Sequence, residues 1–511
     1  MALDGVRNEP VNNTQPAETA KPAEAPKPQA PQAQAPDAKG VDQATANYKA
    51  DDTAETPTTA PTADPNLQTE VQNKRIEAQL TEGAKPADPT ITVSGDNVTI
   101  ETGADDDTVK VSQDAKSGEV TVNVNGKDYK YTGAQSENIT IRTGQGNDVI
   151  EVGKDVTVSF RLEGGEGDDT ITGGAGRDYI NGSKGNDTLN GGGGDDVIYG
   201  GDGDDFINGN DGNDYLDGGK GNDSMFGDAG NDIVSGGLGD DWVSGGTGDD
   251  HLYAGGGKDT LTNLGGNDTL YMQTAQDKTL LAGGATNKVV NVELIGNPGE
   301  VSVKIEGSDE FKERVEADLE FYRSSPTGRA MLESFDQRNK ETGSEGFSLF
   351  GVTVGGKEGY TVTIRETDSG ASAGPTDRPK TWLDATGKPG EGSSGSVNYP
   401  VAERTLYGND PKNPNDNWND APPSLILYHE LAHNYDYLHG TLAPGTYNGA
   451  DKVDAGLNNR ERVATGLPID HDNDPKTPEQ RLPQHPYIYT ENALREELGL
   501  ELRPSYGNPN P

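Results

Sequence analysis

The 511-residue sequence predicts a multidomain protein with a disordered N-terminus, a repetitive β segment and a C-terminal α+β domain. Three observations support this prediction. Residues 1–89 are dominated by small and polar residues and proline, residues 164–271 repeat with a period of nine, and from about residue 301 the composition becomes that of a globular domain. Because the chain has 70 glycines and only 30% hydrophobic residues, much of it cannot form a conventional core.

The charge of the chain narrows the classes of partner. It has 42 basic and 86 acidic side chains, a formal net charge of −44, which disfavours nucleic acid and anionic membranes and favours cations. Cysteine is absent, which excludes disulfide and thiolate chemistry. No run of 18 apolar residues occurs, so we expect no transmembrane segment.

The first two segments differ in pattern. Residues 1–89 contain stretches such as AKPAEAPKPQAPQAQAPDAKG, which nearly lack large apolar residues and cannot offset the entropy cost of ordering. We therefore predict a disordered leader. Residues 90–163 alternate apolar and polar residues between Gly, Asn and Asp turns, which predicts short β-strands. We expect this segment to cap the structure that follows.

Residues 164–271 consist of twelve nine-residue units of the form GGEGDDTIT. The fourth position is always glycine, which permits tight turns, and the eighth is always apolar, which predicts a thin stacked core. The block holds 22 acidic and 4 basic residues, a net charge of −18, so its carboxylates need a cation. The sixth position is Asp in every unit: Asp169, Asp178, Asp187, Asp196, Asp205, Asp214, Asp223, Asp232, Asp241, Asp250, Asp259 and Asp268.

This unit resembles the RTX nonapeptide GGxGxDxUx. The resemblance implies a parallel β-roll, or β-solenoid, in which the twelve Asp residues bind several structural Ca²⁺ ions, and it implies a secreted protein. Because calcium binding becomes folding free energy when the unfolded chain has no site, the roll is expected to fold outside the cytosol. Residues 272–300, which include TNKVVNVELIGNPG, are predicted to form a capping strand and linker.

Residues 301–511 contain the stretch YHELAHNYDYLHG, which holds three of the six histidines of the chain. His429 and His433 are four residues apart, so both lie on one face of a predicted helix and can bind one metal ion. Glu430 lies beside them, in position to activate a water molecule on that metal. This pattern predicts a zinc site with a catalytic general base.

Zinc needs a third protein ligand, and the sequence offers three candidates. His439 has the spacing of the metzincin motif, but Asp436 stands where that motif has a glycine. Asp436 itself lies one turn after His433. Glu461 follows His433 by 28 residues, within the range of gluzincins, although its distance from Asn458 also fits a purely structural capping box. We predict Glu461 as the ligand because it comes from a separate helix and can approach both histidines.

Three stretches, YHELAHNYDYLHG, NNRERVATGLP and YTENALREELGL, together resemble the NleD-like effector metallopeptidases. This resemblance covers about residues 300–511 and implies a zincin-like α+β fold and a gluzincin-like zinc endopeptidase. It implies one catalytic Zn²⁺ on His429, His433 and Glu461, with Glu430 as the catalytic base. It also implies a protein or peptide substrate, in a host where the protein is delivered as an effector.

The sequence therefore predicts a secreted zinc endopeptidase, of effector or toxin type, that carries a calcium-binding β-roll for folding and export. Type I and type III secretion machinery both remain open as export partners. The alternative is a non-catalytic RTX surface or adhesion protein with an inactive metallopeptidase-like domain. The sequence does not determine the substrate or its cleavage motif.

Overall fold

The computed structural model describes residues 88–503, apart from 274, 282–285, 295, 344–346, 350–351, 355–358, 368–370, 377–379, 382–387, 400–421, 444–457, 468, 470–480, 482–484 and 501. All described residues belong to one compact unit. The predicted disordered leader lies outside the described residues, apart from its last two positions.

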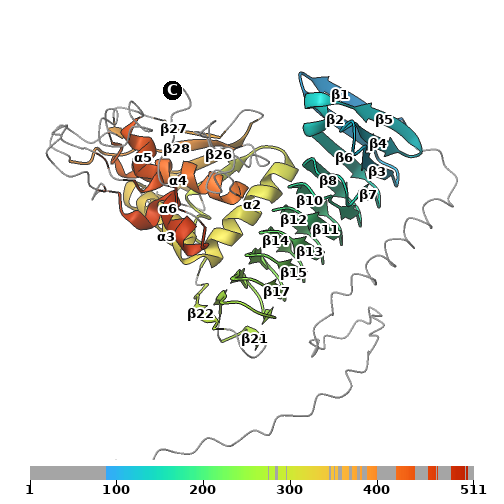
Figure 1. Cartoon of the computed structure of the whole chain (residues 1–511). Coiled ribbons are helices and arrows are strands. Elements are labelled where there is room, and N and C mark those ends of the chain that lie inside the picture. Colours follow the sequence, from blue (N-terminus) through green and yellow to red (C-terminus); the bar gives the residue numbers. More distant parts are fainter. Residues whose placement is uncertain are drawn as a thin grey trace, which may run out of the picture. The chain divides into compact units, whose positions relative to one another are not determined.

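The repeat forms a coil of two parallel sheets, with one strand in each sheet for every 18 residues (Figure 1). The first sheet runs through β6 (Ile139–Gln145), β8 (Phe160–Glu166), β10 (Tyr179–Lys184), β12 (Val197–Asp202), β14 (Tyr215–Lys220), β16 (Ile233–Ser235), β18 (His251–Tyr253), β20 (Thr269–Met272) and β22 (Lys288–Asn291). The second runs through β7 (Val149–Val152), β9 (Thr170–Thr172), β11 (Thr188–Gly193), β13 (Phe206–Asp211), β15 (Ser224–Ala229), β17 (Trp242–Thr247), β19 (Thr260–Asn263) and β21 (Lys278–Leu281). The predicted parallel β-solenoid is confirmed.

The register explains the period of nine. Ile180 pairs with Ile198, and Ile198 with Leu216, so each eighth-position residue lies directly over the one 18 residues away. These side chains are fully buried and form a row between the two sheets. One buried side chain for every nine residues is a thin core, because the neighbouring positions face the turns or the outside.

Glycines at the second and fourth positions of most units suit the turn, although Ser183, Asn210 and Asp228 also adopt a positive φ at the second position. Gly201 and Gly203 have φ angles of 117° and 139°, which L side chains rarely adopt. A Cβ at either position would lie 2.0 Å from a backbone carbonyl oxygen of the preceding coil, that of Ser183 or Gly185. The glycines therefore allow successive turns to stack in direct backbone contact.

The segment before the repeat closes the N-terminal end of the coil. It contains β1 (Thr90–Ser94), β2 (Asn97–Gly103), β3 (Thr108–Gln113), β4 (Val120–Val124), β5 (Lys127–Tyr131) and the 3₁₀ helix η1 (Gly133–Glu137). β2 and β3 pair in parallel with β6 and β7, whereas β1 and the β4–β5 hairpin add antiparallel strands. The parallel coil therefore begins before the nonapeptide repeat.

The C-terminal region combines helices and strands, as predicted. Its four-stranded sheet has the order β23 (Val303–Glu306), β26 (Val362–Glu366), β28 (Gly395–Tyr399), β27 (Ser372–Pro375), and a separate hairpin pairs β24 (Phe347–Leu349) with β25 (Val352–Val354). Its helices are α2 (Asp309–Ser324), α3 (Pro326–Thr342), α4 (Pro423–His439), α5 (Asn459–Thr465), the 3₁₀ helix η4 (Tyr487–Tyr489) and α6 (Glu491–Glu497).

Helix α4 is the centre of this region. It begins with Pro423 at its first turn, which suits the fixed φ of proline, and it ends at Gly440 with a left-handed φ of 69°. Nearly every residue of α4 is buried, because α3, α5, α6, β27 and β28 all contact it. A helix enclosed on all sides holds its polar side chains in defined positions.

The first sheet of the coil also contacts α2. The ring of Tyr199 lies 3.2 Å from the guanidinium carbon of Arg314, which forms a buried ion pair of 2.7 Å with Asp318. Tyr215 and Tyr253 pack their rings against Phe321, with centroids 5.9 and 5.0 Å away. Tyrosines at the seventh and ninth repeat positions therefore join the coil to the hydrophobic core of the C-terminal region.

We expect calcium to control the β content of the full-length chain. Chelation with EGTA should reduce the far-ultraviolet β signal, and millimolar Ca²⁺ should restore it, because buried carboxylates repel one another without a cation. Circular dichroism measures this change, and Mg²⁺ at the same concentration is the control, since it prefers strict octahedral sites and retains its water. Unchanged β content in EGTA would contradict a calcium-dependent coil.

Candidate functional site

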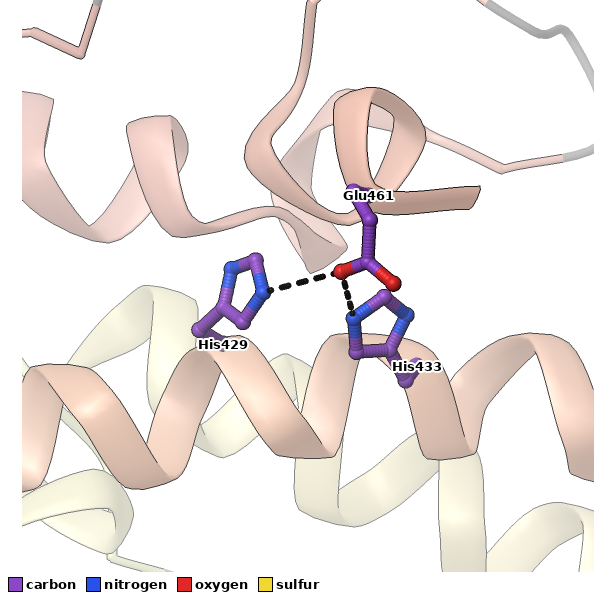
Figure 2. A group of neighbouring side chains, drawn as sticks. All are labelled: His429, His433 and Glu461. Atoms are coloured by element: carbon purple, nitrogen blue, oxygen red, sulfur yellow. Dashed lines mark hydrogen bonds and ion pairs between the residues drawn. The ribbon is translucent and has the colours of Figure 1, made fainter. Parts of the chain in front are cut away.

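The predicted metal ligands His429, His433 and Glu461 lie together. The two histidines project from α4, and Glu461 approaches them from α5 (Figure 2). One ligand atom from each residue lies within 4.8 Å of the other two. Glu461 Oε2 lies 2.9 Å from His433 Nε2 and 3.8 Å from His429 Nε2. Two imidazole nitrogens and one carboxylate form a donor set that fits a zinc ion with an open coordination position.

The two alternative ligands face other partners. Asp436 Oδ1 lies 2.9 Å from His485 Nδ1 and accepts a hydrogen bond of 2.5 Å from the Thr441 hydroxyl. The Nδ1 atom of His439 lies 2.9 Å from the backbone carbonyl oxygen of Tyr435, and the imidazole stacks on the aromatic ring of Tyr435. Neither residue belongs to the three-residue cluster. The spacing that resembles a metzincin motif therefore does not assemble a site here.

The spacing of Asn458 and Glu461 also fits a capping box, in which the two side chains would bond to the backbone at the start of α5. Asn458 is the N-cap of α5, but its side chain makes no capping hydrogen bond. The Glu461 carboxylate contacts Arg460 through Oε1 at 3.0 Å and the histidines through Oε2. Its side chain serves the cluster rather than the end of the helix.

Glu430 lies next to His429 on α4 and is buried. Burial lowers the pKa of His429, the carboxylates of Glu461 and Glu491 raise it, and the charge of Glu430 adds to their effect. The side-chain amide of Asn434 donates to the backbone carbonyl of Glu430 at 2.9 Å, one turn along the helix. The helix therefore holds Glu430 next to His429, but Glu430 is not one of the three residues whose ligand atoms converge.

A fourth carboxylate, Glu491, was not predicted from the sequence. Its Oε2 lies 2.9 Å from His429 Nδ1, although the two residues are 62 positions apart. Arg495 and Arg503 donate to the same carboxylate, which is fully buried. The pairing of Glu491 with Arg495 at four residues' distance was visible in the sequence, but it indicates only a helical ion pair. The contact with His429 depends on the tertiary fold.

Charges within the cluster stabilise one another. Burial opposes a charged imidazole, but the carboxylates of Glu461 and Glu491 outweigh it and raise the pKa of His429 to about 9. Burial likewise opposes charge on Glu461, yet the two imidazoles hold the pKa of its carboxyl well below its usual range. Without a metal, a proton on His429 balances carboxylate charge, and a cation in the cluster would replace it.

The repeat Asp residues line the turns of the coil as two ladders. The backbone N–H of Asp169 donates to Oδ1 of Asp187 at 2.7 Å, and that of Asp178 donates to Oδ1 of Asp196 at the same distance. All twelve predicted calcium ligands are buried in this way, and each lies 18 residues from the next in its ladder. The structure therefore brings the sixth-position carboxylates into two rows.

In eight ladder residues the second carboxylate oxygen has no hydrogen-bond partner within the described part of the chain. Oδ2 accepts no hydrogen bond from the described residues in Asp169, Asp205, Asp223, Asp232, Asp241, Asp250, Asp259 and Asp268. Burial raises the pKa of Asp205 to about 9 and that of Asp241 to about 10, and neighbouring Asp charges add to the shift. Buried carboxylate oxygens without donors fit bound cations, because Ca²⁺ takes oxygen ligands from carboxylates and backbone carbonyls.

Two parts of the chain match known protein families. Residues 300–506 match the peptidase M91 family, whose description is effector protein. Five overlapping matches between residues 161 and 270 identify the RTX calcium-binding nonapeptide repeat. The chain joins RTX repeats to an M91 effector domain. No curated protein and no solved structure matches it.

The resemblances stated from the sequence are thereby confirmed. The M91 domain contains the three-residue cluster, Glu430 and Glu491, and the RTX match contains all twelve ladder Asp residues. Within the described part of the chain, no helix is long and apolar enough to cross a membrane. One part of the chain thus matches a peptidase family described as effector protein, and another part matches calcium-binding repeats.

Proposed function

We propose that the M91 domain is a zinc-dependent endopeptidase of the gluzincin type, with His429, His433 and Glu461 as its ligands. The observation that carries this proposal is the convergence of their ligand atoms within 4.8 Å in a buried site. An ordinary pair of core histidines would not require a carboxylate from a separate helix between them. A zinc ion held there supplies Lewis-acid activation of water and of the scissile carbonyl.

Glu430 is the proposed general base. It lies beside His429 on α4 but outside the ligand set, so its carboxylate remains available for proton transfer. It takes a proton from the attacking water while the water oxygen bonds to the peptide carbonyl carbon. The C–N bond then breaks, and Glu430 returns the proton to the leaving amine. The products are an amine and a carboxylic acid, which loses its remaining proton to solvent and becomes a carboxylate at neutral pH.

Glu491 is the proposed positioning residue of the site. A carboxylate accepts but does not donate, so the 2.9 Å contact places a proton on His429 Nδ1, and Nε2 is the nitrogen that would bind the metal. Arg495 and Arg503 hold this carboxylate in place, and they lower the pKa of Glu491 despite its burial. Such partners fix the tautomer and the ring orientation of a metal ligand.

The RTX coil is proposed to fold after export. Its carboxylates need calcium, and a cytosol poor in Ca²⁺ would leave the coil open for passage through secretion machinery of type I or type III. We propose a secreted protein that acts outside the producing cell or inside a host cell, on a protein or peptide substrate. The M91 match to an effector family and the RTX repeats support this location.

Glu430→Gln should abolish cleavage and retain zinc. The amide cannot accept the proton, whereas the three ligands stay in place, so we expect a loss of about 10² or more in kcat/KM. Cleavage of casein and of a peptide library by the full chain in Ca²⁺ and Zn²⁺ measures activity, and elemental analysis measures bound zinc. Glu333→Gln, on the surface of α3, is the control and should remain active. Full activity of the Glu430 variant with zinc bound would rule out this mechanism.

Glu461→Ala should weaken zinc binding more than His439→Ala or Asp436→Asn. Loss of an outer partner of a zinc ligand already costs about 10–100-fold in affinity, so loss of a direct ligand should cost at least as much. Competition with a chromophoric chelator at one fixed pH measures the three affinities, and thermal unfolding shows whether each variant is folded. If His439→Ala loses zinc while Glu461→Ala keeps it, the ligand assignment is wrong.

A further inference from the structure

Two turns that precede the nonapeptide repeat share its pattern in part. In GQGNDVI, which begins at Gly144, the second, fourth, sixth and eighth repeat positions are Gly144, Gly146, Asp148 and Ile150. In the unit around the turn 103–107, the second, sixth and eighth positions are Gly103, Asp107 and Val109, whereas the fourth position is Asp105 instead of glycine. Thr102 and Thr143 replace the first glycine. Both turns lie outside the RTX match, which begins at residue 161.

The backbone of these turns continues that of the repeat. Gly103 pairs in parallel with Gly144, and Gly144 with Gly165. A Cβ on Gly167 would lie 2.0 Å from the carbonyl oxygen of Gly146, and one on Gly185 would lie 2.1 Å from that of Gly167. The turns before the repeat therefore stack as closely as those within it, and the row of backbone carbonyls runs through them.

The carboxylate ladder extends through the same turns. The backbone N–H of Asp107 donates to Oδ1 of Asp148 at 2.6 Å, and that of Asp148 donates to Oδ1 of Asp169 at 2.8 Å. Asp169 continues to Asp187 in the same way, at 2.7 Å. Asp107 and Asp148 are therefore the first two members of the ladder that contains Asp169.

Both carboxylates are buried, and one oxygen of each lacks a hydrogen-bond donor among the described residues. Asp107 and Asp148 are each 1% exposed, and the Oδ2 atom of each accepts no hydrogen bond within the described residues. Burial raises the pKa of Asp148 to about 7, although the N–H of Asp107 opposes the shift. Lys110 and Arg142, the basic residues on the adjoining strands β3 and β6, pair with glutamates instead. No basic side chain therefore balances these two carboxylates among the described contacts.

We propose that the calcium-binding ladder begins at Asp107, so that the turns 103–107 and 144–148 bind Ca²⁺ outside the recognised repeat. The oxygen donors are the carboxylates of Asp107 and Asp148, the stacked backbone carbonyls and the hydroxyl of Thr143, which suit the six to eight oxygens that Ca²⁺ takes. Asp107, Asp148 and Asp169 are 41 and 21 residues apart instead of 18, because the β4–β5 hairpin and a longer loop lie between them. The RTX match does not include these turns. The inference rests on calcium binding by the roll itself.

Calcium stoichiometry of full-length variants tests this proposal. Asp148→Asn and Asp107→Asn retain the size of the side chain but remove its charge, and each should lose at least one Ca²⁺ per chain after equilibration at a fixed free calcium concentration. Asp155→Asn removes the same charge from an exposed position in the same segment and should bind as many ions as the wild type. Wild-type stoichiometry in both ladder variants would overturn the proposal.

Anomalous diffraction from calcium in crystals of the wild-type protein gives an answer that does not depend on the folding of a variant. We expect a peak between Asp107 and Asp148 in addition to peaks along the repeat. Peaks along the repeat with none beside Asp148 would overturn the extended ladder alone. An absence of peaks along the repeat as well would contradict the calcium role of the whole roll.

Discussion

The burial of aspartate carboxylates in stacked turns is the constraint on which the coil depends. Each turn places one Asp under the next, and the glycines between them let the backbones approach to direct contact. The apolar core offers one side chain for every nine residues, which is too little to offset many buried like charges. Cations bound in the turns would relieve the repulsion between these carboxylates, and the RTX match implies that calcium is the cation.

The M91 domain also places ionisable side chains close together in a largely buried cluster, that of His429, His433 and Glu461. Helix α4 is enclosed by other elements, so its two histidines are held in a fixed direction, and α5 and α6 each bring one carboxylate to them. Glu461 faces the Nε2 atoms of both imidazoles, whereas Glu491 contacts the other ring nitrogen of His429, Nδ1. Carboxylates therefore approach the two imidazoles from two sides.

The short helix α6 connects these two systems. At its start, Glu491 contacts His429; at its end, Glu497 accepts hydrogen bonds from the hydroxyl of Tyr253 at 3.2 Å and from the N–H of Thr327 at 2.8 Å. The hydroxyl of Tyr271 donates to the backbone carbonyl of Glu497 at 3.0 Å. Since Tyr253 and Tyr271 lie on the first sheet of the coil, a seven-residue helix joins the RTX repeats to the histidine cluster. The tyrosines at the ninth repeat position are therefore contacts with the M91 domain as well as strand residues.

The sequence by itself determined the features that repeat locally or lie within one turn of helix. The period of nine predicted the turns, the buried row and the twelve ladder residues, because successive units repeat the same pattern of turns and strands. The spacing of His429 and His433 predicted a shared face, because a helix repeats every 3.6 residues. Tertiary structure decided the rest. The choice among Glu461, Asp436 and His439 as the third candidate ligand depends on the approach of α5 to α4. Glu491 and Asp107 were identified by contacts with residues 62 and 41 positions away in the chain, and local periodicity carries no information over such distances.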